Sequence, residues 1–255
     1  WPPGMRRAIV SAMHPLKALI FDVDGTLADT ERDGHRPAFN AAFAELGLDW
    51  HWDETLYGEL LAITGGKERM RHFAEHHAPE MAARGDFDGL IRDLHAAKTR
   101  HYLHLVETGA LPLRPGVAAL IQHARQRGLR LAIATTTTPE NVTALLRATL
   151  GLDASGWFEV IGAGDIVPNK KPAPDIYRWV LDRLALPAEN CLAIEDSANG
   201  LRAARAAGLR CLVTPNDYTA GEDFSGAWRV LSNLREFDLD GISVQTISNL
   251  ANISG

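Results

Sequence analysis

The chain has 255 residues, of which 46% are hydrophobic and 23% are charged. This is the composition of a globular protein, long enough for one large domain or two small ones. A net charge of −6, without a long run of Lys or Arg, argues against nucleic acid as a partner. No apolar segment reaches the length that crosses a bilayer, which argues against a membrane partner. We expect a cytoplasmic protein that is a monomer.

The two ends of the chain differ in character from the rest. Residues 1–12 precede Met13, a natural start, and we interpret them as an extension. Their arginine pair and short apolar run are too short for a signal peptide, and no cleavage site follows. Residues 241–255 are polar and lack periodicity, which predicts a tail. Cys191 and Cys211 each open an apolar run and are expected to be buried reduced thiols.

An apolar strand near the start of the chain is followed by two carboxylates. Leu19–Phe21 is typical of a buried parallel strand, and Asp22 and Asp24 follow it one residue apart. Side chains at i and i+2 share a face of a strand, so these carboxylates would repel unless a cation or a proton lies between them. Gly25 allows a sharp turn, and Thr26 can donate a hydrogen bond back to Asp24.

The next stretch has almost no β-branched run. Ala, Leu, Glu, His and Arg recur at helical spacing from about residue 31 to 109, which predicts a small helical bundle inserted after the first strand. We place this insert at residues 30–111. Pro112–Gly116 is expected to be the linker that leads the chain from this insert back to the rest of the fold.

From Val117 on, helix and strand patterns alternate. This alternation predicts an α/β fold with a doubly wound parallel sheet, built from residues 13–29 and 112–240. The expected helices cover 117–127, 139–150, 175–184 and 200–207, and the expected strands cover 129–135, 158–163, 191–195, 211–214 and an edge strand at 230–231.

Polar groups follow each of the strands that such a sheet would contain. In an open α/β sheet, ligands bind beyond the carboxyl ends of the strands. Thr135 ends one strand and precedes a helix, where hydroxyls and free N–H groups can seat a phosphate, with Thr138 as the helix cap. Lys171, before a proline, is expected to point inward. Glu195 and Asp196 end a buried strand, and with the first acidic pair they predict a Mg²⁺ site.

The order Asp-x-Asp-Gly-Thr, Thr, Lys-Pro and Glu-Asp resembles the four motifs of the haloacid dehalogenase-like (HAD) phosphohydrolases. The resemblance spans nearly the whole chain, and it implies a Rossmann-like core and a helical cap at residues 30–111. It implies that Asp22 is the nucleophile and Asp24 the general acid/base. Thr135 would bind the transferring phosphoryl group, and Lys171 would stabilise its charge.

The same resemblance implies a Mg²⁺ cofactor. Asp22, the backbone carbonyl of Asp24, and Asp196 would hold the ion, with Glu195 assisting. For attack on phosphorus, Asp22 must be ionised while Asp24 carries a proton. We expect the ion on Asp22 and a hydrogen bond from Thr26 to separate the two pKa values in that sense.

The insert contains a candidate second anion site. Thr64–Arg69 reads Thr-Gly-Gly-Lys-Glu-Arg before a helix, which exposes backbone N–H groups beside two basic side chains and predicts a bisphosphate substrate. With Glu31, the run 33–36 and the run 134–137, this string is similar to CbbY-type proteins. These xylulose-1,5-bisphosphate phosphatases of carbon-fixing bacteria and chloroplasts remove an inhibitor of Rubisco. The residues that the resemblance places around the sugar bisphosphate are Glu31, His35, Arg36, Gly65, Gly66, Lys67, Arg69, Thr136 and Thr137.

Other functions share part of this pattern. A β-phosphoglucomutase has the same motifs, but the mutases carry a lysine where this chain has Thr136–Thr138, which favours hydrolysis. A phosphoglycolate phosphatase would not need a second anion site. A phosphoacceptor signalling domain would be about half as long and would lack the helical insert. The His-x-x-Glu-His pattern of some zinc peptidases occurs at His72–His76, where a solvated helix face is the simpler interpretation.

Overall fold

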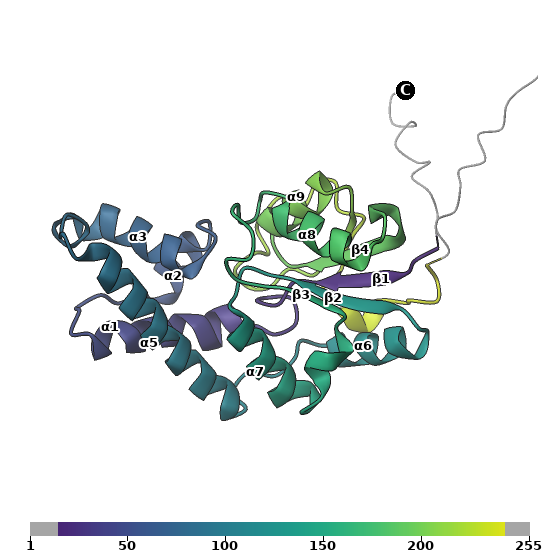
Figure 1. Ribbon diagram of the computed structural model, residues 1–255, viewed down its shortest axis with the longest axis horizontal. Helices are drawn as coiled ribbons and strands as arrows, with labels where there is room; N and C mark the ends of the chain where they lie inside the picture. The colour runs from purple at the N-terminus through teal and green to yellow at the C-terminus, as the bar shows by residue number, and fades with distance from the viewer. Residues whose placement is uncertain (1–14, 243–255) are drawn as a thin grey trace, which may run out of the picture.

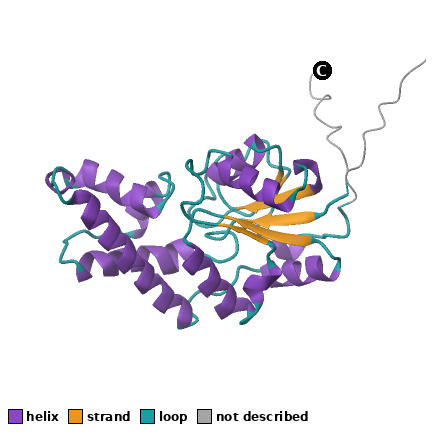
Figure 2. Ribbon diagram, in the orientation of Figure 1, coloured by secondary structure: helices purple, strands orange, loops and turns teal. Residues whose placement is uncertain are grey.

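The computed structural model of the chain describes residues 15–242, so the expected extension and most of the expected tail lie outside the described residues. Two lobes lie side by side in Figure 1. One contains the sheet with helices on both faces, and the other is entirely helical, as the colouring by secondary structure shows (Figure 2). Within residues 15–242, no helix is both long and apolar enough to span a membrane.

The sheet has six parallel strands in the order β3-β2-β1-β4-β5-β6. The strands are β1 (Ala18–Phe21), β2 (Arg130–Ala134), β3 (Val160–Gly162), β4 (Cys191–Glu195), β5 (Arg210–Val213) and β6 (Arg229–Val230). β1 lies between β2 and β4, and its last residue, Phe21, is in register with Ile133 and Ile194. The carboxyl ends of the three central strands are therefore level with one another.

Two helices cover each face of the sheet. Alternate side chains of a strand point to opposite faces, and β1 shows this directly. Leu19 and Phe21 pack with α6 (Val117–Gln126) and α7 (Pro139–Leu150), whereas Ala18 and Ile20 pack with the helices of the opposite face. Those helices are α8 (Asp175–Leu184) and α9 (Ala198–Ala206), which lie above the sheet in Figure 1. Because every residue of β1 is fully buried, the strand holds its carboxyl end in a fixed place.

The helical lobe comes between β1 and β2 in the chain. It contains η1 (Glu31–His35, a π-helical turn), α1 (Arg36–Glu45), α2 (Glu54–Leu60), α3 (Gly66–His77), α4 (Pro79–Ala82) and α5 (Phe87–Glu107). Its core is aromatic, with Phe39, Phe43, Trp52 and Phe73 packed at tilted or edge-to-face angles. α5 packs against α1 in this lobe and also against α7 in the other, so it joins the two.

The expected α/β fold with a doubly wound parallel sheet is confirmed. The helices over 139–150 and 175–184 and the strand over 191–195 match their expected bounds, and the edge strand lies one residue earlier than expected. Short 3₁₀ turns lie at η2 (Ala154–Trp157), η3 (Ala188–Asn190) and η4 (Leu234–Glu236). The described cysteines are both buried and free, as expected. The division into a core and a cap at residues 30–111 stays a prediction.

Candidate active site

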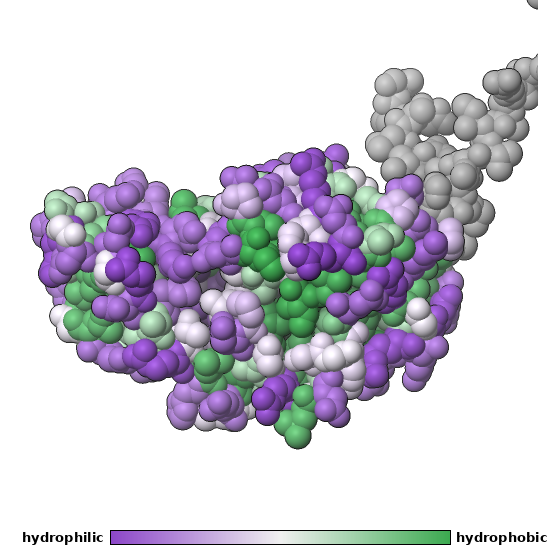
Figure 3. Space-filling model, viewed as in Figure 1, coloured by the Kyte–Doolittle hydropathy of each residue, from purple (hydrophilic) through white to green (hydrophobic). Residues whose placement is uncertain are grey.

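The groups at the strand ends meet in one pocket between the two lobes. Asp22 follows β1, Thr135 follows β2, and Lys171 lies in the loop after β3. Glu195 ends β4, and Asp196 follows it. The hollow has a volume of about 650 Å³ when its open mouth is included. Hydrophilic side chains border the junction of the lobes, whereas a hydrophobic patch lies on the core between α8 and α7 (Figure 3). The pocket therefore suits a small polar ligand.

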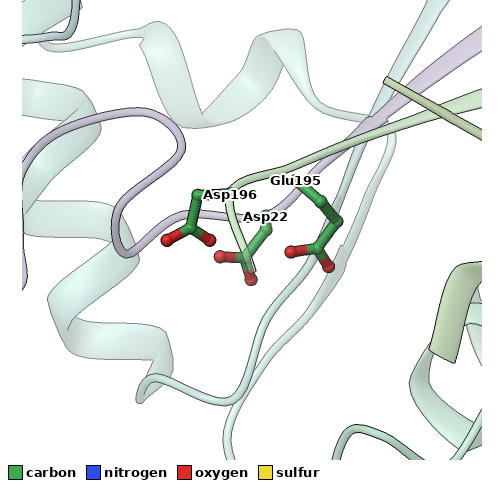
Figure 4. A group of neighbouring side chains, drawn as sticks. All are labelled: Asp22, Glu195 and Asp196. Carbon is green, nitrogen blue, oxygen red and sulfur yellow. The ribbon is translucent and has the colours of Figure 1, made fainter. Parts of the chain in front are cut away.

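Three buried carboxylates form the floor of the pocket. Asp22, Glu195 and Asp196 each offer an oxygen, and these oxygens lie within 4.8 Å of one another. Figure 4 shows the three side chains hanging in the same direction from the ends of β1 and β4, with Asp22 in the middle of the view. Lys171 Nζ lies 2.6 Å from Asp22 Oδ1 and 2.7 Å from Glu195 Oε1. One ammonium against three carboxylates leaves a negative balance that fits a divalent cation with oxygen ligands.

The pKa values of these groups are shifted because the charged side chains lie close together and are buried away from water. Burial is the largest cause that raises the pKa of Asp22, which reaches about 7 although Lys171 opposes the shift. Burial next to Asp22 and Glu195 also raises the pKa of Asp196 well above its usual range. Burial lowers the pKa of Lys171, but the two carboxylates outweigh it and raise the pKa overall. A cation beside Asp22 and Asp196 would lower their pKa values and relieve this repulsion.

Asp24 points away from the three carboxylates, toward the helical lobe. Its Oδ1 accepts a hydrogen bond from Thr30 Oγ1 at 2.6 Å and lies 2.9 Å from His35 Nε2. The other ring nitrogen of His35 lies 2.8 Å from Nζ of the buried Lys98. The expected bond from Thr26 to Asp24 is wrong, because Thr26 Oγ1 donates to Asp196 Oδ1 instead, at 3.4 Å. The turn at Gly25 carries Thr26 to the other side, and Thr30 takes the expected role.

These contacts order the two pKa values against the sequence-based expectation. Burial alone would raise the pKa of Asp24, but His35 and Thr30 hold it well below its usual range. Asp22, with a pKa of about 7, is the more basic of the two. The order is the reverse of the one that attack by Asp22 requires. A cation at the carboxylate floor would lower the pKa of Asp22 and favour its ionised form.

Glu195 is held from two sides. Its Oε1 accepts hydrogen bonds from Lys171 and, at 2.5 Å, from the hydroxyl of Tyr177 on α8. Its Oε2 has no hydrogen-bond partner among the described residues and lies over Gly200 of α9. Glu195 therefore supports Lys171 directly, which leaves Asp22 and Asp196 as the carboxylates best placed for a cation.

The end of β2 forms the polar wall of the pocket. Thr135 is buried, and its Oγ1 accepts a hydrogen bond from Thr137 N at 3.3 Å. Thr136 lines the pocket, and Thr138 caps α7 through Asn141 N, as expected. Hydroxyls at the start of a helix form a suitable seat for phosphoryl oxygens.

The helical lobe contributes a second polar hollow that shares its wall with the first. Glu31, Gly65 and Arg69 line both, and Gly66, His35 and Thr137 line the second. The basic and imidazole side chains that line this second hollow are those of Arg69, Lys98, His35 and His95. The buried Arg69 Nη1 donates to the Tyr57 hydroxyl at 2.9 Å, and that hydroxyl donates to Glu31. A second anion site in this hollow stays a prediction.

Two of the expected sugar ligands do not line either hollow. Lys67 Nζ is 2.6 Å from Asp165 in the core, and Arg36 lies 3.3 Å from Glu54. Lys170 is largely buried and bridges Glu68 and Asp165 at 2.9 and 3.0 Å. We call Lys67, Glu68, Asp165 and Lys170 the cap–core ion pairs. A substrate role for Lys67 and Arg36 stays a prediction.

Several residues around the pocket were not predicted. Asn216 and Thr219 follow β5, and the rule that polar groups at strand ends form the site would have found them. Lys98 and His95 lie on α5, where sequence spacing alone indicates an ordinary helix. Tyr177 looks like a core residue of α8, and no sequence signal separates it from one.

Comparisons with known proteins agree with this geometry. Residues 16–208 match the sequence profile of a family of hydrolases, the haloacid dehalogenase-like hydrolases. Protein CbbY (plasmid) of Cupriavidus necator is 57% identical over 219 residues, 86% of each chain. Protein CbbY of Rhodobacter capsulatus is 54% identical over 236 residues, 92% of this chain and 99% of its own.

A solved structure is similar over most of its length. It is a variant of CbbY from Rhodobacter sphaeroides in complex with xylulose 1,5-bisphosphate, with 51% identity and a TM-score of 0.81 over 87% of this chain and 96% of that one. The chain therefore belongs to the haloacid dehalogenase-like hydrolases, and within them to the CbbY-type phosphatases.

Proposed function

We propose that this phosphatase hydrolyses a small sugar bisphosphate, xylulose 1,5-bisphosphate, with Mg²⁺ and through an aspartyl phosphate on Asp22. The observation that carries the proposal is the pairing of two polar hollows. One is lined by Asp22, Lys171 and Thr135, and the other, which shares Arg69 with it, is also lined by Lys98. Two anionic groups on one substrate would use both. The relative from Rhodobacter sphaeroides has been solved with that bisphosphate, which supports the same substrate class here.

The chemistry follows from the placement of the side chains. A carboxylate oxygen of Asp22 attacks phosphorus, and the bond from phosphorus to the sugar oxygen breaks. Asp24 gives a proton to the leaving alkoxide and then takes one from the water that cleaves the aspartyl phosphate. Because His35 and Thr30 hold the pKa of Asp24 low, it takes up the first proton when the negative charge of the substrate phosphate beside it raises that pKa. His35 and Thr30 both bind Asp24 Oδ1, which leaves Oδ2 for this proton transfer. Lys171 and Thr135 hold the phosphoryl oxygens.

The donor set fits Mg²⁺. Asp22 and Asp196 would hold the ion together with the backbone carbonyl of Asp24, and Glu195 would assist by fixing Lys171. The ion would supply positive charge that favours ionised Asp22 and offsets the charge of the phosphoryl group.

The helical lobe would decide which phosphate enters. Gly65 and Gly66 present backbone N–H groups at the start of α3, and the buried Arg69 faces the cavity from the same helix. We propose that these groups, with Lys98, take the second phosphate. The absence of a basic side chain at Thr136–Thr138 supports hydrolysis over mutase chemistry.

The test is phosphate release from a panel of substrates with and without Mg²⁺. We expect turnover of xylulose 1,5-bisphosphate and little from ribulose 1,5-bisphosphate, β-glucose 1-phosphate or phosphoglycolate. Asp22→Asn should lower the rate of turnover by at least about 10³-fold, since the nucleophile is lost. Conversion of β-glucose 1-phosphate to glucose 6-phosphate, with xylulose bisphosphate inert, would replace the proposal with a mutase. A role in carbon fixation, a cytoplasmic location and a monomeric state stay predictions.

A further inference from the structure

A buried arginine, Arg114, lies in the segment that leads from α5 to α6. The side chain of Arg114 is 8% exposed, and its guanidinium donates to three backbone carbonyls and pairs with one carboxylate. The partners are the carbonyls of Gly25, Thr214 (2.6 Å) and Pro215 (2.6 Å), and Asp29 Oδ1 (3.1 Å). Arg114 lines neither of the two hollows described above.

These partners belong to the two segments that flank Asp196. Gly25 is the turn after the first acidic pair, and a Cβ there would lie 2.1 Å from Asp196 Oδ2 and 2.5 Å from Asn216 Nδ2. Asn216 directly follows Pro215, and its Nδ2 donates to Asp196 Oδ2 at 2.7 Å. Arg114 thus ties together the two backbones between which the Asp196 carboxylate is held.

The loop after β5 makes the contact to Asp196 rigid. Asn216 Oδ1 accepts from the backbone N–H groups of Tyr218 and Thr219, at 2.9 and 3.2 Å, and Thr219 Oγ1 accepts from Asn216 N at 2.9 Å. With the amide oxygen used in this turn, the amide nitrogen can point only to Asp196. The carbonyls of the two preceding residues are the ones that Arg114 holds, so the turn cannot shift without breaking those bonds.

The ion pair of Arg114 with Asp29 contributes less than its hydrogen bonds to the three backbone carbonyls. The Asp29 side chain is 49% exposed, and pairs with such exposure contribute little. The carbonyls are different, because buried backbone oxygens need donors, and a planar guanidinium can serve three at once. A lysine at this position would keep the charge and lose that geometry.

We propose that Arg114 is a positioning residue for cation binding, which acts on Asp196 through Asn216 and Gly25. The proposal rests on the proposed Mg²⁺-dependent function and deepens it. Partners of metal-ligating carboxylates typically change metal affinity by about 10–100-fold when they are removed. We expect a loss of about tenfold for Arg114→Lys, and a similar loss for Asn216→Ser, in which the hydroxyl can still close the turn but cannot reach Asp196.

The experiment measures Mn²⁺ binding to the full chain by electron paramagnetic resonance, without substrate. Asp196→Asn identifies the site, since binding at it should be lost. Arg130→Lys is the matched control, because Arg130 lies at the opposite end of β2 and pairs with Glu159 on the surface. In Arg114→Ala, millimolar guanidinium should restore Mn²⁺ affinity and ammonium at equal concentration should not.

The outcomes separate a positioning role from a merely structural one. Weaker Mn²⁺ binding in Arg114→Lys and Asn216→Ser, with wild-type binding in Arg130→Lys, supports the proposal. Wild-type Mn²⁺ affinity in a folded Arg114→Lys or in Asn216→Ser overturns it, as does rescue by ammonium. If Arg114→Lys does not fold, the affinity of Asn216→Ser decides. Mn²⁺ affinity could fall in Arg114→Lys and Asn216→Ser while the wild-type chain releases no phosphate from any substrate. That result would uphold the role of Arg114 and overturn only the proposed function.

Discussion

Gly200 lies in the first turns of α9, against the carboxylate of Glu195. A Cβ at this position would be 1.9 Å from Glu195 Oε2 and 2.3 Å from Oε1. Glu195 is fully buried, and it cannot move aside without breaking its bonds to Lys171 and Tyr177. We therefore expect Gly200→Ala to displace the carboxylate or to push α9 away from β4.

The size of the effect follows from the bonds at risk. Hydrogen bonds to charged groups contribute about 1.5–3 kcal/mol each, so the loss of two costs about 3–6 kcal/mol. Alanine in place of glycine in a helix returns about 1 kcal/mol. The free energy of unfolding of Gly200→Ala should fall by about 2–5 kcal/mol, and its Tm by roughly 5–20 °C for a chain of this size.

Urea and thermal unfolding measure this change, and Gly89→Ala in α5 is the matched control. A Cβ at Gly89 meets only Arg92 Nη2, at 3.7 Å, so that variant should be stabilised by up to about 1 kcal/mol. Phosphatase activity should also fall in Gly200→Ala, because Lys171 loses one of its two carboxylate partners. Equal stability of the two alanine variants would refute the steric reasoning.

Three further predictions concern the surroundings of the pocket. Asp165→Asn removes the carboxylate that Lys67 and Lys170 share in the cap–core ion pairs. Because these ion pairs are partly exposed, we expect KM to rise about threefold at low salt and the rise to disappear near 1 M salt. An unchanged KM at low salt would contradict this prediction. Tyr177→Phe removes a donor to Glu195 and should lower kcat about tenfold with little change in KM, which steady-state kinetics would show. Burial lowers the pKa of His95 from 6.5 to about 4, so its contribution to stability is complete above pH 6.5 and is lost as pH falls from 6.5 toward 4, by up to about 3 kcal/mol. His95→Gln should flatten that part of the stability profile in urea unfolding, and the exposed His104→Gln should not; identical profiles would count against the burial argument.

Most of the central site follows from the sequence, because the strand ends are local features. A buried apolar run predicts a parallel strand, and the carboxyl ends of parallel strands meet at one edge of the sheet. Asp22, Thr135, Lys171 and Asp196 could therefore be assigned to one place without knowledge of the strand order, and the structure brings them together there.

The helical lobe was predicted as an element but not in its detail. Lys67 and Arg69 lie two residues apart on α3, about 200° around its axis, so both cannot face one pocket. Packing of the aromatic core sets the rotation of the helix, which turns Arg69 inward and leaves Lys67 for Asp165. The same holds for Lys98, whose role depends on how α5 packs beside His35.

The sequence by itself determined the fold class, the family and the floor of the site, because each rests on residues joined by short stretches of chain or on the ends of strands. The tertiary structure alone decided which partner each polar group takes. Thr30 rather than Thr26 binds Asp24, and Arg114 joins the backbone at Gly25 to the backbone at Thr214, which lie 89 and 100 residues from it in the chain. Such choices depend on partners that are remote in sequence, since Thr26 donates to Asp196, 170 residues away, and only the packing of the core brings such segments together.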